Sequence, residues 1–270
     1  MLKVHSDRLL YFEQQYTNTK KYIVTFIDEA YKLMPGMEVL EIGCGEGGVL
    51  KAFIDKGMKG VGVDLHTYKF DLAVQFLDEY IKDGRISLIN KDIYSPDLHE
   101  QFNGRFDLII LKDTLEHIFD QEKLIGYLRG FLKDNGIMFL AFPPWYMPFG
   151  GHQQMCSNKF LSFMPYYHLL PLFLYTALLK AFKEDDQLIK ELLNIKKTRI
   201  SLQRYKRIVK EKGFKTVREQ LYFINPNYEI KFNLKPRKLN RIIGAVPYIR
   251  DFATTTIYSL IQKQKASNIR

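Results

Sequence analysis

The sequence predicts an α/β protein with a mostly parallel β-sheet and helices on both of its faces. In the first half of the 270-residue chain, short β-rich runs alternate with amphipathic stretches, the pattern of a parallel sheet wound by helices. A composition of 46% hydrophobic and 26% charged residues is ordinary for a globular protein. The length is sufficient for a packed core without disulfides.

Five candidate strands occupy the first half of the chain. They cover residues 38–42, 60–63, 86–90, 106–111 and 137–142. The helical patterns around them cover residues 19–33, 48–56, 69–82 and 121–133. Asn135 and Gly136 tolerate a left-handed backbone, so we expect them to end the last of these helices.

The pattern changes after the fifth strand, where two prolines are followed by an aromatic and glycine-rich loop. Residues 160–179 then contain no Asp, Glu, Lys or Arg, and this length meets the usual threshold for a membrane-spanning helix. Pro165 and Pro171 interrupt the segment, and a crossing would separate the first five strands from later ones. We therefore expect a helical insertion that packs on the domain as a lid, with interfacial membrane contact as the alternative.

The last part of the chain is expected to complete the sheet. Residues 201–212 have a helical pattern ended by Gly213, and residues 214–224 and 254–262 are candidate sixth and seventh strands. The basic, proline-interrupted stretch between these strands is unassigned. The expected divisions are an N-terminal helical segment 1–35, a core 36–144, a helical insertion 145–200 and a completing segment 201–270 with a basic insertion.

The formal net charge of +10 is unevenly distributed along the chain. Residues 196–270 hold nineteen Lys and Arg against four Asp and Glu, a net charge of +15. Such asymmetry favours an anionic partner, which can be a phosphate-bearing small molecule, nucleic acid or lipid headgroups. A solvated basic face is the structural alternative.

The two cysteines, Cys44 and Cys156, can form neither a disulfide framework nor a four-ligand zinc site by themselves. No metal site is predicted. The first residues lack an uninterrupted apolar stretch and a small-residue cleavage site, so no secretory signal is expected. A reducing, cytoplasmic location is the resulting expectation.

A glycine-rich turn follows the first strand in the sequence VLEIGCGEGG. Glycines at this point let the backbone approach a ligand closely and present amide donors to it. Gly43, Gly45 and Gly48 also match the dinucleotide pattern G-x-G-x-x-G, so a nicotinamide or flavin enzyme is a competing interpretation.

The charge beside this turn distinguishes a dinucleotide from S-adenosylmethionine as the ligand. Glu41 precedes the first glycine and Glu46 follows the second, whereas a pyrophosphate requires amides without a nearby carboxylate. S-adenosylmethionine has no phosphate and carries an ammonium and a sulfonium group. The acidic residues therefore favour the methyl donor over NAD.

Two further carboxylates follow successive strands. Asp64 ends the second strand, where it can accept hydrogen bonds from ribose hydroxyls in either cofactor. Asp92 follows the third strand, in position for an exocyclic adenine amine, with Ile93 beside the ring. Together with Glu41, these residues form a more specific set than any one of them alone.

The runs EIGCGEG, GVDL, NKDIY, FDLIILKDTLEHI and LKDNGIMFLAFPP make residues 36–144 resemble the class I, Rossmann-like S-adenosylmethionine-dependent methyltransferases. The resemblance implies a seven-stranded sheet whose last strand is antiparallel. The later PPWYMPFGGHQ and MPYYHLLP resemble a subset of bacterial methyltransferases. The resemblance assigns donor binding to Glu41, Gly43, Cys44, Gly45, Asp64, Leu65, Asp92, Ile93 and Lys112.

Catalytic candidates lie in the loops after the fourth and fifth strands, at the edge where such sheets bind ligands. They are His117, His152 and Asp113. His152 follows two glycines in an aromatic loop and can act as a general base toward a hydroxyl, or can order the loop by a hydrogen bond. His117 can equally cap a helix, and Asp113 can orient an acceptor.

The main functional hypothesis is methyl transfer to a hydroxyl or amine of a small molecule such as a sugar, lipid or metabolite. DNA-base methylation is disfavoured because Lys112-Asp113-Thr114 stands where those enzymes usually carry Asn/Asp-Pro-Pro-Tyr. The alternatives are an RNA methyltransferase that uses the basic C-terminal segment, an NAD(P)-dependent oxidoreductase, and a non-catalytic donor-binding or membrane-associated scaffold.

Overall fold

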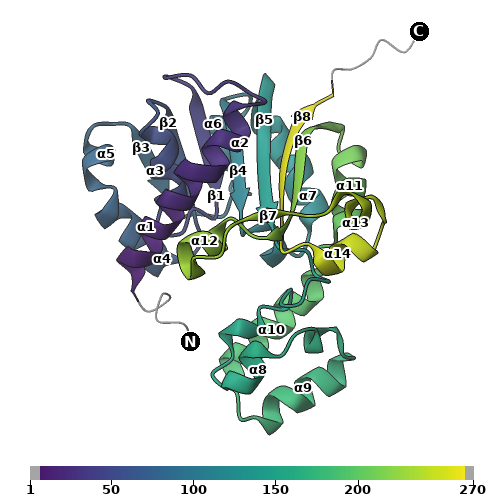
Figure 1. Ribbon diagram of the computed structural model, residues 1–270. Coiled ribbons are helices and arrows are strands. Elements are labelled where there is room, and N and C mark those ends of the chain that lie inside the picture. The colour runs from purple at the N-terminus through teal and green to yellow at the C-terminus, as the bar shows by residue number, and fades with distance from the viewer. Residues whose placement is uncertain (1–6, 265–270) are drawn as a thin grey trace.

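The computed structural model describes residues 7–264, and its centre is a single β-sheet with helices on both faces (Figure 1). The first five strands run parallel to one another. The strands are β1 Glu38–Ile42, β2 Lys59–Val63, β3 Ile86–Ile89, β4 Phe106–Lys112, β5 Leu132–Phe142, β6 Phe214–Ile224, β7 Arg237–Lys238 and β8 Thr256–Lys263.

The strand order is β3-β2-β1-β4-β5-β8-β6-β7. β8 is the expected antiparallel last strand and lies between β5 and β6. The described part of the sheet has eight strands because β7, a two-residue strand in the unassigned stretch, pairs with β6. The predicted count of seven omitted this short edge strand, whose two residues show no periodicity to detect.

Two hydrophobic layers enclose the sheet. Ile109 of β4 packs in a cluster with residues of α6, α7 and α11, while its neighbour Leu108 packs with α1, α2 and α3, since alternate strand residues face opposite sides. These helices are α1 Arg8–Asn18, α2 Val24–Asp28, α3 Gly48–Ile54, α6 Pro96–Phe102, α7 Gln121–Leu128 and α11 Leu202–Glu211. Helices α4 Thr67–Phe76 and α5 Asp78–Lys82 precede β3.

Three helix predictions need correction. The helix expected at 69–82 is broken at Leu77, and the one expected at 19–33 begins with a π-helical turn Thr19–Ile23 and ends at Asp28. The helix expected at 121–133 ends at Leu128 and a 3₁₀ turn, so Asn135 and Gly136 lie inside β5 and do not end a helix. Pairing of the buried Leu132 with Phe106 draws this segment into the sheet.

The insertion after β5 projects from the end of the sheet (Figure 1). It contains α8 Lys159–Phe163, α9 Leu172–Ala181 and α10 Asp186–Thr198, which enclose a small core of their own. The charge-free stretch 160–179 is therefore two short helices separated by its prolines. Among the described residues, no helix has the length and apolarity needed to cross a membrane.

The stretch between β6 and β8 contains three short helices. They are α12 Asn227–Phe232, α13 Arg241–Ala245 and α14 Ile249–Ala253. α12 lies beside α1 near the carboxyl end of the sheet (Figure 1). This position brings the C-terminal part of the chain close to the end of β4.

Candidate functional site

The turn between β1 and α3 has the backbone that its glycines allow. Gly45 has a φ of +53°, and a Cβ at this residue would meet no atom within 4 Å, so this backbone borders open space. Gly48 instead faces protein, since an added Cβ would lie 2.4 Å from the carbonyl oxygen of Phe12. The turn is thus held against α1 on one side and is free on the other.

A cavity of about 100 Å³ lies at this free side of the turn. It is bounded by the glycine turn, by α1 and by the ends of β1, β2 and β4. Seven of the predicted donor-binding and catalytic residues line it: Glu41, Gly43, Cys44, Gly45, Asp64, Lys112 and Asp113.

Glu41 places a buried carboxyl group at this cavity. Its side chain is 2% exposed, and within residues 7–264 its Oε2 atom has no hydrogen-bond partner. Burial raises the pKa of Glu41 well above its usual range, and the charge of Lys112 opposes this increase only in part. Because one oxygen of this group has no partner within residues 7–264, the group is suited to a cationic ligand.

Asp64 joins the end of β2 to the glycine turn. Its Oδ2 accepts a hydrogen bond from the Gly45 amide at 2.7 Å, and its Oδ1 accepts one from the His66 amide at 2.7 Å. Each carboxylate oxygen has a second lone pair. Asp64 can consequently hold the turn and accept two ligand hydroxyl hydrogens at the same time.

Lys112, at the end of β4, already has hydrogen-bond partners within the protein. Its Nζ donates to Gln15 Oε1 at 2.7 Å and to Asp113 Oδ2 at 2.5 Å. Burial lowers the pKa of Lys112, but Asp113, Tyr11 and Glu41 together outweigh it, so the net pKa is raised. Asp113 has a φ of +52° and is held as an anion by this pair.

The remaining predicted donor residues lie outside this cavity. Leu65 is 68% exposed, and Ile93 is buried after β3. Asp92 is exposed and accepts a hydrogen bond from the Tyr94 amide at 2.9 Å. These residues follow β2 and β3 at the same edge of the sheet as Asp64.

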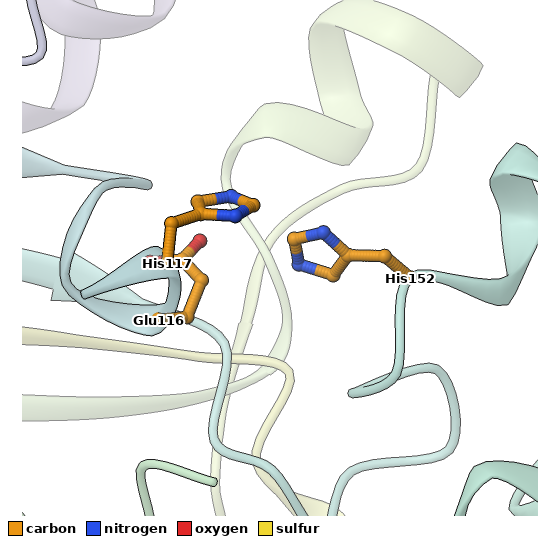
Figure 2. Close-up of side chains that lie close together, drawn as sticks. All are labelled: Glu116, His117 and His152. Atoms are coloured by element: carbon orange, nitrogen blue, oxygen red, sulfur yellow. The ribbon is translucent and has the colours of Figure 1, made fainter. Parts of the chain in front are cut away.

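His117 and His152 come together from two separate segments (Figure 2). His117 belongs to a 3₁₀ turn, Leu115–His117, after β4, and the centroids of the two rings are 5.0 Å apart. Burial, followed by the effects of His117 and His168, lowers the pKa of His152 to about 3, so its ring is neutral near pH 7. Glu116 lies beside them and was missed in the sequence because a buried glutamate in a short turn has no recognisable pattern.

The cavity also depends on α1, which the sequence-based helix at 19–33 did not include. Tyr11, Phe12 and Gln15 of this helix line the cavity. The signal that would have located α1 is Asp7, whose side chain accepts from the Leu10 amide as an N-cap.

The comparisons with known proteins agree with this geometry. A family model described as a methyltransferase domain matches residues 14–219. The ubiquinone biosynthesis O-methyltransferase of Pseudomonas aeruginosa is 30% identical over 118 residues, which cover 44% of this chain and 49% of that protein. The chain thus spans about half the length of the curated relatives it matches.

Solved structures share the architecture at low sequence identity. A putative sarcosine dimethylglycine methyltransferase from Galdieria sulphuraria matches with a TM-score of 0.57 and 15% identity, covering 91% of this chain and 85% of that one. A Haemonchus contortus phosphoethanolamine N-methyltransferase in complex with S-adenosylhomocysteine matches with a TM-score of 0.56 and 16% identity, covering 91% and 53%.

The sheet, the glycine turn and the acidic strand ends define a class I methyltransferase fold. The chain belongs to the methyltransferase domain family, whose model spans most of its length.

Proposed function

We propose that this protein binds S-adenosylmethionine in the cavity beside the glycine turn and transfers its methyl group to a small molecule. The observation that carries the proposal is the buried Glu41 carboxyl group, whose Oε2 has no partner among the described residues and which lines the same cavity as Asp64. A ligand with an ammonium group and a ribose would place a positive charge beside Glu41 and hydroxyl donors beside Asp64. When bound, this donor supplies a methyl group that its sulfonium already activates.

The residues around the cavity fit this ligand one group at a time. Glu41 would neutralise the ammonium, and Asp64 would accept hydrogen bonds from the ribose hydroxyls. Gly45 leaves open space for close approach of the ligand to the backbone. Asp92 and Ile93 would contact the adenine from the neighbouring strand end.

A dinucleotide fits this cavity less well. Its pyrophosphate would lie near Glu41, which is 2% exposed and forms no ion pair among the described residues, and near Glu46, whose charge Arg8 balances. Repulsion between buried carboxylates and phosphates is strong because little water screens it. An NAD(P)-dependent reaction is therefore not proposed.

We propose that the acceptor lies beside Asp113, on the side of His117 and His152. The main role of the protein there is to align the acceptor with the methyl group. The O-methyltransferase relatives favour a hydroxyl over an amine as the acceptor. Lys231 on α12, whose charge acts on Asp113, would meet an anionic group of the acceptor.

We propose that residues 145–200 form a lid over this acceptor side. Thr198 of α10 donates to the backbone carbonyl of Glu116 at 2.5 Å and so connects the insertion to the turn after β4. Trp145 is buried against His168 of the insertion and supports the lid from inside. Tyr146, 37% exposed, remains available to contact the acceptor.

We also propose peripheral contact between the insertion and a membrane. Apolar side chains on α8 and α9 are exposed, among them Phe163 at 75% and Phe173 at 71%. Cosedimentation with vesicles should fall when both phenylalanines are replaced by Ser, and unchanged cosedimentation would exclude this contact surface.

We further propose a reducing, cytoplasmic compartment, which suits the two free, buried cysteines.

Calorimetric titration of the full chain tests the donor assignment. S-adenosylmethionine and its demethylated product should bind, and Asp64→Ala should weaken both by about 10-fold or more, since a charge-assisted hydrogen bond contributes about 1.5–3 kcal/mol. Asp78→Ala, which removes an exposed carboxylate on α5, is the matched control and should bind normally. Tight NADH binding without donor binding would overturn the proposal.

A further inference from the structure

Three side chains that can ligate a metal meet next to the donor cavity. Glu116 and His117 come from the turn after β4, and His152 comes from the loop after β5. One ligand atom from each of the three lies within 4.8 Å of the others. Figure 2 shows the two imidazole rings pointing toward each other, with the Glu116 carboxylate beside them.

The Glu116 carboxyl group is buried and has one oxygen without a partner. It is 4% exposed, and no atom within residues 7–264 hydrogen-bonds to its Oε2. Lys112, whose charge acts on Glu116, already donates to Gln15 and Asp113. A bound cation would therefore supply the partner that this oxygen lacks.

The ring nitrogens of the two imidazoles are available for metal ligation. A histidine binds a metal ion through a ring nitrogen that carries no proton and makes no other hydrogen bond. His168, a buried histidine of this region, has both ring nitrogens hydrogen-bonded, to Gln153 and to the Trp145 carbonyl. Within residues 7–264, no comparable hydrogen bond engages the rings of His117 and His152.

We propose that Glu116, His117 and His152 bind a divalent transition-metal ion, zinc or ferrous iron. Two imidazoles and one carboxylate are a common ligand set for these ions, whereas magnesium and calcium prefer oxygen ligands. Ligands at about 2.1 Å from an ion lie roughly 3–4 Å apart. Small side-chain rotations close the present spacing to that range.

The backbone holds the ligands in place from two sides. Thr198 Oγ1 donates to the Glu116 carbonyl at 2.5 Å, so α10 fixes the turn that carries Glu116 and His117. His152 has a φ of +57°, a left-handed conformation that is uncommon for a residue other than glycine and that recurs at functional sites. His152 is fixed in a conformation in which its ring faces His117 (Figure 2).

Three protein ligands leave at least one coordination position for an outside oxygen. The charge of Asp113 acts on all three ligands, so the three residues lie near Asp113, on the proposed acceptor side. If the proposed methyl transfer is correct, a hydroxyl oxygen of the acceptor would take this position, and the ion would orient it. The role in acceptor binding thus rests on the proposed function, whereas the site itself does not.

Metal titration of the chelator-treated full chain tests the site directly. Calorimetry with Zn²⁺ and visible absorption with Co²⁺ should each show one equivalent bound, with no thiolate charge-transfer band. Glu116→Gln, His117→Asn and His152→Asn should each lower the affinity for Zn²⁺ by about 10-fold or more. His99→Asn is the matched control, because His99 belongs to α6, packs against Tyr127 and is not one of the three ligands, and it should bind like the wild type.

Thermal unfolding and donor binding complete the test. Zn²⁺ should raise the unfolding temperature of the wild type and of His99→Asn but not of the three ligand variants. The variants should keep donor affinity, since Glu41 and Asp64 are untouched, and this shows that they are folded. The site would be overturned by absence of stoichiometric metal binding, by a thiolate band, or by wild-type affinity for Zn²⁺ in the three variants. Zn²⁺ binding without donor binding would instead overturn only the proposed methyl transfer.

Discussion

Gly48 and Phe12 are in direct backbone contact, because a Cβ added to Gly48 would lie 2.4 Å from the carbonyl oxygen of Phe12. This contact holds α1 against the start of α3, so that residues of α1 line the donor cavity. Neither residue needs to touch a ligand to influence binding.

Gly48→Ala is therefore expected to displace α1. The clash involves backbone, so it should destabilise the protein by about 1–3 kcal/mol and weaken donor binding as well. Gly130→Ala is the control, since a Cβ at Gly130 meets no atom within 4 Å. Denaturant unfolding and calorimetry measure the two effects, and a variant with wild-type stability would contradict the contact.

Glu41→Gln is expected to separate stability from binding. The substitution removes a buried ionisable group whose Oε2 lacks a partner within the described residues, so the free energy of unfolding at pH 7 should be unchanged or increased. Donor affinity should nevertheless fall about 10-fold or more, because Gln cannot neutralise an ammonium. Glu38→Gln, which breaks an ion pair with Arg105 outside the cavity, serves as the control. Equal donor affinity in Glu41→Gln and wild type would refute the assignment.

His168 is expected to make the stability depend on pH. It is fully buried, and burial, opposed by its hydrogen bond to the Trp145 carbonyl, lowers its pKa to about 4. The unfolded chain binds a proton near pH 6.5, so stability is complete above that pH and declines as the pH falls toward 4. The loss should be about 3 kcal/mol, at about 1.4 kcal/mol per tenfold change in proton affinity.

The variant His168→Gln tests this origin of the pH dependence. Gln can donate to the Trp145 carbonyl as the ring nitrogen does, but it does not titrate. Between pH 4 and 7, the free energy of unfolding should change less with pH for the variant than for the wild type. Identical pH dependence in the two proteins would assign the effect to other groups.

His152→Ala is expected to impair turnover without affecting the donor. His152 belongs to the proposed acceptor side and does not line the donor cavity. Turnover should fall about 100-fold, the magnitude expected for loss of a group that acts on the reacting oxygen. Donor affinity, measured by calorimetry, should match that of the wild type. A variant with unchanged turnover and acceptor affinity would exclude His152 from the site.

Much of the fold follows from local patterns in the sequence. The five parallel strands, the sixth and the antiparallel last strand lie where alternating or continuous apolar runs predicted them. Glu41 and Asp64 could be placed at one edge from sequence, because the carboxyl ends of parallel strands share an edge. Strand periodicity and strand ends are properties of a few adjacent residues, so they can be read without knowledge of the rest of the chain.

Other features depended on contacts between distant parts of the chain. The pairing of Lys112 with Gln15, the approach of His152 to Glu116 and His117, and the short β7 strand had no counterpart in any local pattern. Gln15 and His152 lie far from their partners in the chain, and only packing of α1 and of the loop after β5 brings them together. Sequence therefore determined which strand ends carry charge, while the tertiary structure decided which charges are neutralised, because burial and pairing are set by the whole fold.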